Sequence, residues 1–124
     1  MIRSSQIPDV LRRICGDGIH SAALVTGDGE LLGTSLRHPS ESLANQSTLI
    51  AEIASDYVRL ASELRQRSLL FVCLELDQGM VAIATAGPDF VMAICEFGTP
   101  LGLLQGKVMA CALHVQEALT PMVV

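Results

Sequence analysis

The sequence of 124 residues contains four cysteines, which could act as nucleophiles, redox groups or metal ligands. Cys15, Cys73, Cys95 and Cys111 form no C-x-x-C pair, and each lies within an apolar segment. A zinc site would need further cysteines or histidines at ligand spacing, and a disulfide framework would show closer spacing in a secretory context. The pattern therefore predicts small, buried thiols and no metal site.

Three histidines and two glutamates are the other candidates for acid–base chemistry. His20 begins a predicted strand, His38 precedes a proline in a loop, and His114 lies in the last predicted helix. Separated residues can assemble into a triad in space, but no serine or cysteine occupies a G-x-S-x-G elbow. Glu75 and Glu96 could be tuned acids, yet their places near strand ends favour emergence into solvent. We predict no catalytic residue and no enzymatic activity.

Two glycine patterns could indicate ligand binding or close packing. Gly27-Asp28-Gly29, with Gly33, misses the G-x-G-x-x-G spacing by one residue. This loop joins two predicted strands, whereas a phosphate loop opens a helix, so it predicts a hairpin turn and no cofactor site. Gly102 and Gly106 form G-x-x-x-G in the last predicted helix, which favours close packing of that helix on the sheet.

Composition limits the class of protein. Half of the residues are hydrophobic, 17% are charged and 3% are aromatic, which excludes disorder and predicts an aliphatic core. The net charge is −5 and the only lysine is Lys107, so nucleic-acid binding is not expected. No apolar run reaches the ~20 residues of a membrane span, and the N-terminus lacks signal-peptide and myristoylation patterns. We expect one domain over residues 1–124, in the cytoplasm.

The order of predicted elements is helix, two strands, helix, three strands and helix. Short turns between strands predict an antiparallel sheet, and three helices for two sheet faces predict a three-layer α+β sandwich. The predicted helices and strands are, in chain order, Pro8–Cys15, His20–Thr26, Glu30–Ser35, Glu41–Arg65, Leu69–Leu76, Met80–Ala86, Phe90–Phe97 and Pro100–Leu119.

The long helix predicted from Glu41 to Arg65 has more apolar surface than one sheet can cover. With ~100° per residue, its apolar arc spans roughly 200°, whereas packing on a single core needs a stripe of about 100° or somewhat more. The strand Leu69–Leu76 is nearly continuously apolar, and such a strand at a sheet edge would aggregate unless it is paired. Both features predict a protein partner, although periodicity leaves open which flank of the helix faces it.

Three stretches carry a resemblance to a known family: Ile19–Ser35, Gly79–Ile83 and Leu101–Thr120. With the order of elements, they resemble the roadblock (dynein light-chain) family. Within it, nearly the whole chain is similar to the smaller roadblock scaffold subunit of Ragulator, the late-endosomal and lysosomal adaptor complex, and the last helix is the most specific part of that likeness. The resemblance implies a roadblock-like sandwich around a five-stranded antiparallel sheet, without catalytic activity or cofactor.

The resemblance also implies partners. Family members pair through the central helix and the third strand, so we expect a second roadblock-fold protein, with a heterodimer favoured over a homodimer. The pair would support Rag-type GTPases, other scaffold subunits and kinase signalling in nutrient and MAP kinase pathways. It would reach the late-endosomal or lysosomal surface only through a lipidated partner. The expected interface residues are Leu49, Ile50, Ile53, Tyr57, Leu60, Phe71, Val72, Cys73 and Leu74.

Other functions stay open. The segment Arg37–Ser47 and a short connection before Leu69 depart from the Ragulator subunit, which affects the choice of partner more than the fold. One alternative is a homodimeric regulator of a small GTPase, as prokaryotic relatives are, or a dynein light chain. Another is a small-ligand sensor, which would need polar groups converging on an apolar cavity of several hundred Å³.

Overall fold

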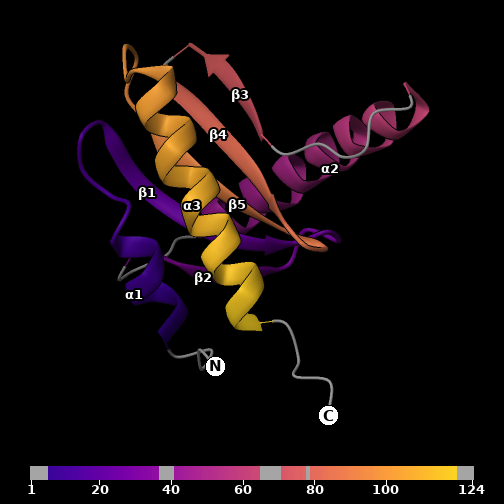
Figure 1. Cartoon of the computed structure of the whole chain (residues 1–124), viewed down its shortest axis with the longest axis horizontal. Coiled ribbons are helices and arrows are strands. Elements are labelled where there is room, and N and C mark those ends of the chain that lie inside the picture. The colour runs from indigo at the N-terminus through magenta and orange to yellow at the C-terminus, as the bar shows by residue number, and fades with distance from the viewer. Residues whose placement is uncertain (1–5, 37–40, 65–70, 78, 120–124) are drawn as a thin grey trace.

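The computed structural model describes residues 6–36, 41–64, 71–77 and 79–119. These residues form three helices and five strands in the predicted order, and their arrangement can be followed in Figure 1. They are α1 (Ile7–Arg12), β1 (Ile19–Thr26), β2 (Leu31–Thr34), α2 (Glu41–Glu63), β3 (Phe71–Leu76), β4 (Gly79–Ala86), β5 (Asp89–Cys95) and α3 (Leu101–Leu119).

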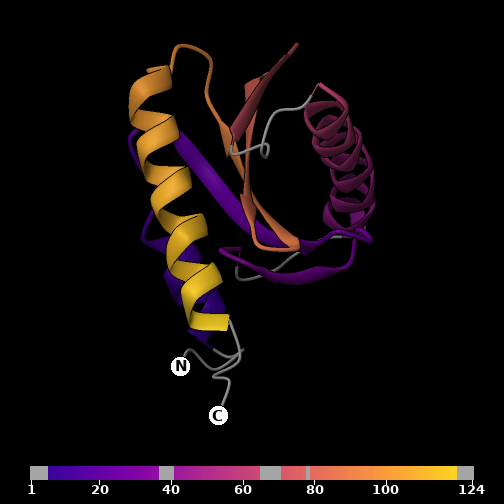
Figure 2. The same cartoon turned by 45° about the vertical axis from the view of Figure 1, so that its right-hand side comes forward.

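The strands form one antiparallel sheet in the order β2-β1-β5-β4-β3, as the short turns predict. β1 and β4, which are distant from each other in sequence, flank β5 at the centre. β2 and β3 are the two edge strands, and the described part of β3 pairs only with β4. The predicted three-layer α+β sandwich is confirmed, with α1 and α3 on one face and α2 on the other (Figure 2).

The face that carries α1 and α3 holds the larger core. α3 buries Leu104, Val108, Cys111 and Val115 against alternate residues of the strands. These positions follow the 3.6-residue repeat, so they form one stripe along α3. Lys107 Nζ lies 3.0 Å from a carboxylate oxygen of Asp17, and this ion pair links α3 to the loop before β1.

The face that carries α2 holds a smaller core. Among the described side chains of α2, only those of Ala51 and Ala54 are fully buried. Two alanines allow close approach to the sheet, but they bury little apolar surface. At the β1–β2 turn, Thr48 Oγ1 donates a hydrogen bond of 3.4 Å to the carbonyl of Gly29, which ties the helix to the hairpin.

Several element ends differ from the prediction. α1 ends at Arg12, before the predicted end at Cys15. Turns follow it, because the backbone at the three consecutive residues 16–18 has positive φ and cannot continue the helix. β5 ends at Cys95 because the chain turns at residues 97–98, where Gly98 has a φ of +80°. The predicted end of the long helix at Arg65 lies outside the described residues.

Candidate functional site

The predicted acid–base candidates lie on the surface. His20 Nε2 is 3.5 Å from Glu96 Oε1, and both side chains are more than half exposed. Glu75 and His114 are exposed as well. The side chains of Glu75 and Glu96 therefore emerge into solvent, as predicted. His38 lies outside the described residues. Across the described ranges, no group of three or more His, Cys, Asp or Glu residues could hold a metal ion.

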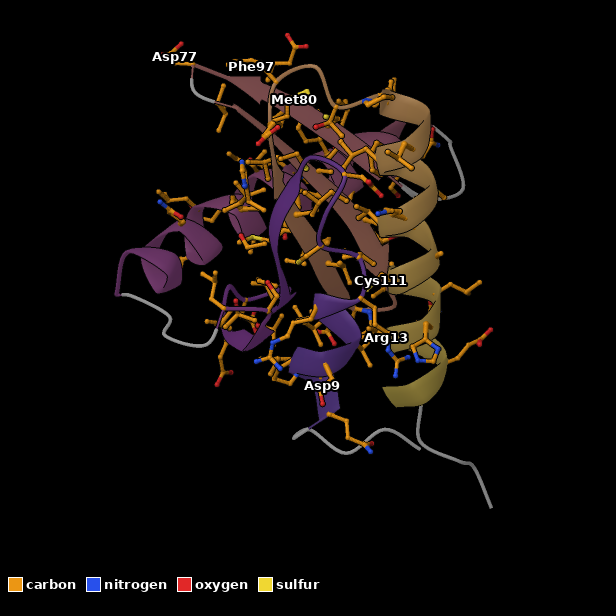
Figure 3. The ribbon with its side chains drawn as sticks, turned by 90° about the vertical axis from the view of Figure 1, so that its left-hand side faces the viewer. Asp9, Arg13, Asp77, Met80, Phe97 and Cys111 are labelled. Carbon is orange, nitrogen blue, oxygen red and sulfur yellow. The ribbon has the colours of Figure 1, made fainter. Side chains whose placement is uncertain are left out.

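The thiols sit in surroundings that suppress reactivity. Cys95 and Cys111 are buried, and burial raises the pKa of each to about 11. Burial also raises the pKa of Cys73, with a smaller contribution from the Glu75 carboxylate. Cys111 lies on the sheet-facing side of α3 (Figure 3). Nucleophilic cysteines have a lowered pKa, so these three thiols are packing groups. Cys15 and Cys73 are only half-buried, which the prediction of buried thiols missed.

The glycines have structural roles. Gly29 adopts a φ of +93° in the predicted hairpin turn, and a Cβ there would come within 2.9 Å of Thr48 Cα. This glycine therefore permits the close approach of α2. The prediction for Gly102 and Gly106 is wrong, because both are exposed and a Cβ on either would meet no atom within 4 Å.

One side of α2 is apolar and uncovered. We define the open flank of α2 as Leu49, Ile53, Tyr57, Leu60 and Leu64. Their exposed fractions are, in that order, 59%, 40%, 38%, 48% and 62%. At 100° per residue they fall on one side of the line through Ala54, which faces the sheet. The structure thus resolves which flank packs on the sheet and which remains available.

The edge strand β3 continues this apolar surface. Val72 and Leu74 are half-buried on the α2 side of the sheet, opposite Ile83 and Val81 of β4. Phe71 and Cys73 alternate with them, pointing to the α3 side. The outer backbone groups of an edge strand are available for pairing with another strand.

A cavity of about 410 Å³ connects the two elements. It lies between the first half of α2 and the strands β3, β4 and β5. Its lining is Gln46, Leu49, Ile50, Leu76, Gly79, Met80, Val81 and Ile94. The volume suits a small ligand, but Gln46 is the only polar side chain in this lining, so the convergent polar groups of a sensor site are absent from it.

The predicted interface residues fall into three groups. Leu49, Ile53, Tyr57 and Leu60 lie on the open flank, whereas Ile50 is half-buried and packs toward the sheet. The four residues 71–74 lie on β3 and alternate between the two faces. Leu64 and Leu76 are exposed next to these groups and were not predicted; the apolar arc of the helix includes Leu64 and could have indicated it.

None of the described helices is both long and apolar enough to cross a membrane.

Solved structures share this architecture. Myxococcus xanthus MglB superposes with a TM-score of 0.84 and 16% identity, over 100% of this chain and 96% of that chain. The gliding protein MglB of Thermus thermophilus superposes with a TM-score of 0.77 and 18% identity, over 92% of this chain and 88% of that chain. A Roadblock/LC7 domain from Streptomyces avermitilis superposes with a TM-score of 0.79 and 15% identity, over 98% of this chain and 100% of that chain. At these identities the likeness shows the fold alone.

No curated protein matches the chain significantly in sequence. The family model of the Roadblock/LC7 domain, however, matches residues 10–96, which is more than two thirds of the chain. The match covers both the open flank of α2 and the edge strand β3. α3, which is the most specific part of the resemblance to the Ragulator subunit, lies beyond the matched residues. The chain belongs to the Roadblock/LC7 domain family.

Proposed function

We propose that this chain is a non-enzymatic module that pairs with a second copy of itself through the open flank of α2 and the edge of β3, and that the pair binds a small GTPase. The observation that carries the proposal is the joint exposure of these two apolar elements on one side of the molecule. Contiguous exposed apolar surface of this kind typically marks a protein interface.

Symmetry makes the two elements compatible with one interface. When a strand pairs with its own copy about a two-fold axis, the pairing is antiparallel and the two sheets merge into one. The two α2 helices then lie on the same face. The cavity lined by Leu49 and Leu76 shows that the open flank borders the β3 side of the sheet, so the partner's α2 would cover it.

The outward side of α2 is suited to a further partner. Asp56 and Arg59 form an ion pair of 2.8 Å there, and Glu52 and Glu63 are exposed nearby. This polar ridge would remain in solvent after pairing. The GTPase itself is inferred from the resemblance to prokaryotic roadblock proteins that act on small GTPases, and the similar fold of MglB from two bacteria supports that choice.

The pairing is tested by light scattering over a concentration series, with Tyr57→Asp as the disrupting variant. A charge at the centre of a desolvated interface is costly, so a dimer of the native chain should become a monomer. Leu113→Asp is the matched control because Leu113 is 57% exposed on α3, far from the open flank. A native chain that stays monomeric at all concentrations would reject self-pairing.

The GTPase is tested separately. Ras-like GTPases loaded with GTP or GDP are titrated against the native dimer, and hydrolysis is followed by phosphate release. Binding that depends on the nucleotide supports a regulator. If the dimer is intact but binds no GTPase of the panel, a small GTPase is rejected as the partner, and the proposed pairing of the two chains still holds.

A second candidate is the Ragulator-like scaffold, in which the partner is a different roadblock protein. Its support is the resemblance of the chain to the smaller roadblock subunit of that complex, which is most specific in the last helix, from Leu101 to Thr120. It would support Rag-type GTPases and kinase signalling at the late endosome or lysosome, held there by a lipidated partner. A chain that aggregates alone and becomes soluble only when co-expressed with another roadblock subunit would favour this candidate.

A further inference from the structure

The described part of the chain covers the α3 side of β3 only in part. Figure 1 shows α3 lying over β4 and β5, with β3 beyond it. Phe71 and Cys73 of β3 point to this side and are only half-buried. Between β4 and α3 lies a hollow of about 290 Å³, whose lining includes Ala84, Met109 and Leu113.

The flank of α3 that borders this hollow is uncharged along its length. Helical periodicity places Leu101, Gln105, Met109, Leu113 and Gln116 on it. Leu101 and Leu113 are both 57% exposed. The one charged residue between positions 101 and 116, Lys107, lies on the opposite flank and pairs with Asp17. An uncharged helix flank with large exposed leucines is typical of a surface that another element covers.

The proposed pairing, on which this inference rests, turns the hollow into a groove. Three strand-to-strand steps separate β4 from the partner's β4, a distance of about 14–15 Å. Because α3 lies over both β4 and β5, the two α3 axes are then roughly 15–19 Å apart. Packed helices lie about 8–10 Å apart, so two such contacts span about 16–20 Å. The space between the two α3 helices therefore accommodates one helix.

Charge adds a second constraint. Glu75 alternates with Phe71 and Cys73, so it lies on the same face, and its side chain is exposed. In an antiparallel pair, one Glu75 lies on each side of the two-fold axis. The groove thus has an apolar floor, uncharged walls and a carboxylate in each half.

We propose that the paired chains bind one amphipathic helix of a partner protein in this groove, apolar over most of its circumference and with a basic residue in each half. β3 of six residues is about 20 Å long, which corresponds to about 13 residues of helix. One helix is bound per two chains, in either direction along the groove.

The test uses a synthetic helical peptide of about 18 residues, long enough to span the groove. It consists of leucine and alanine with two lysines in each half. A matched peptide carries glutamate in place of lysine, and a third has a central proline. Calorimetry should give one lysine peptide per two chains, with affinity about tenfold or more above that of the glutamate peptide at low salt. The proline peptide should not bind.

Variants separate this groove from the dimer interface. Met109→Asp and Leu113→Asp should each weaken peptide binding about tenfold or more, without changing the dimer mass. Glu75→Gln should reduce the advantage of the lysine peptide. His114→Asp is the control, because it adds the same charge on the opposite, exposed flank of α3 and should leave the affinity unchanged.

Three results would overturn the inference. A stable dimer that binds none of the peptides, or binds them equally well with Leu113→Asp, shows that the groove takes no helix. Association with phosphatidylcholine vesicles that is lost in Leu113→Asp would assign the groove to lipid instead. A monomeric native chain removes the groove together with the proposed pairing, and light scattering identifies this case.

Discussion

The two faces of the sheet differ in how much core they hold. Among the described residues, the face under α1 and α3 contains a cluster of nineteen buried residues, whereas the face under α2 contains eight. Yet α2 is the longer helix, with 23 residues against 19 in α3. Most of the described side chains of α2 therefore add little to the core of their own chain.

The difference lies in where the large side chains point. α3 directs Leu104 and Val108 into the core, with no exposed surface. Among its described side chains, α2 directs two alanines into the core and keeps Leu49, Ile53 and Leu60 on the open flank. One face therefore supplies the stability of the domain, and the other is available for binding. Substitutions on each face test this division.

Leu104→Ala should lower the free energy of unfolding by about 2–5 kcal/mol, because it leaves a cavity in the closed face. Leu103→Ala, one position away and 39% exposed, is the control and should cost well under half as much. Urea denaturation of both variants gives the comparison. Equal losses would show that the α3 face is not the main core.

Thiol reactivity should also distinguish closed from open surroundings. Because burial raises the pKa of Cys111 from 9.0 to about 11, its thiolate fraction at pH 8 falls about 100-fold. A variant that retains only Cys111 should react with a thiol reagent about 100-fold more slowly when folded than when unfolded in guanidinium. Rates that match in the two states would mean that α3 opens readily.

A substitution at Gly18 tests the close contact between the start of β1 and Thr99, which precedes α3. It has a φ of +99°, and a Cβ there would overlap Thr99 Oγ1. Gly18→Ala should therefore destabilise the fold by about 2 kcal/mol or more. Gly98→Ala is the control: its φ is +80° but a Cβ would meet nothing within 4 Å, so only backbone strain of about 1 kcal/mol is expected. Thermal melts of both variants would reject the steric explanation if the losses were equal.

Ile53→Ala should have the smallest effect on the fold. Ile53 is 40% exposed, so the free energy of unfolding of the isolated chain should change by about 0.5 kcal/mol or less. The same variant should weaken dimerisation, which sedimentation over a concentration series would detect. A large loss of stability at concentrations where the chain is monomeric would place Ile53 in the core and contradict the division between the faces.

Local sequence determined most of the elements. Gly27–Gly29 predicts the first hairpin because glycine accepts positive φ, and the apolar runs around Gly79 and Gly87 predict the other strands. The excess apolar surface of the long helix was also evident from its periodicity. These features depend on neighbouring residues, which a sequence displays directly.

Tertiary structure decided the rest. Periodicity gives the width of an apolar arc but not the rotation of the helix about its axis, so only the packing of Ala51 and Ala54 showed that Leu49, Ile53 and Leu60 face outward. The same limit explains the error at Gly102 and Gly106, which lie on the outer side of α3. The position of β3 at the edge depends on pairing between strands distant in sequence, and residue spacing does not encode that order.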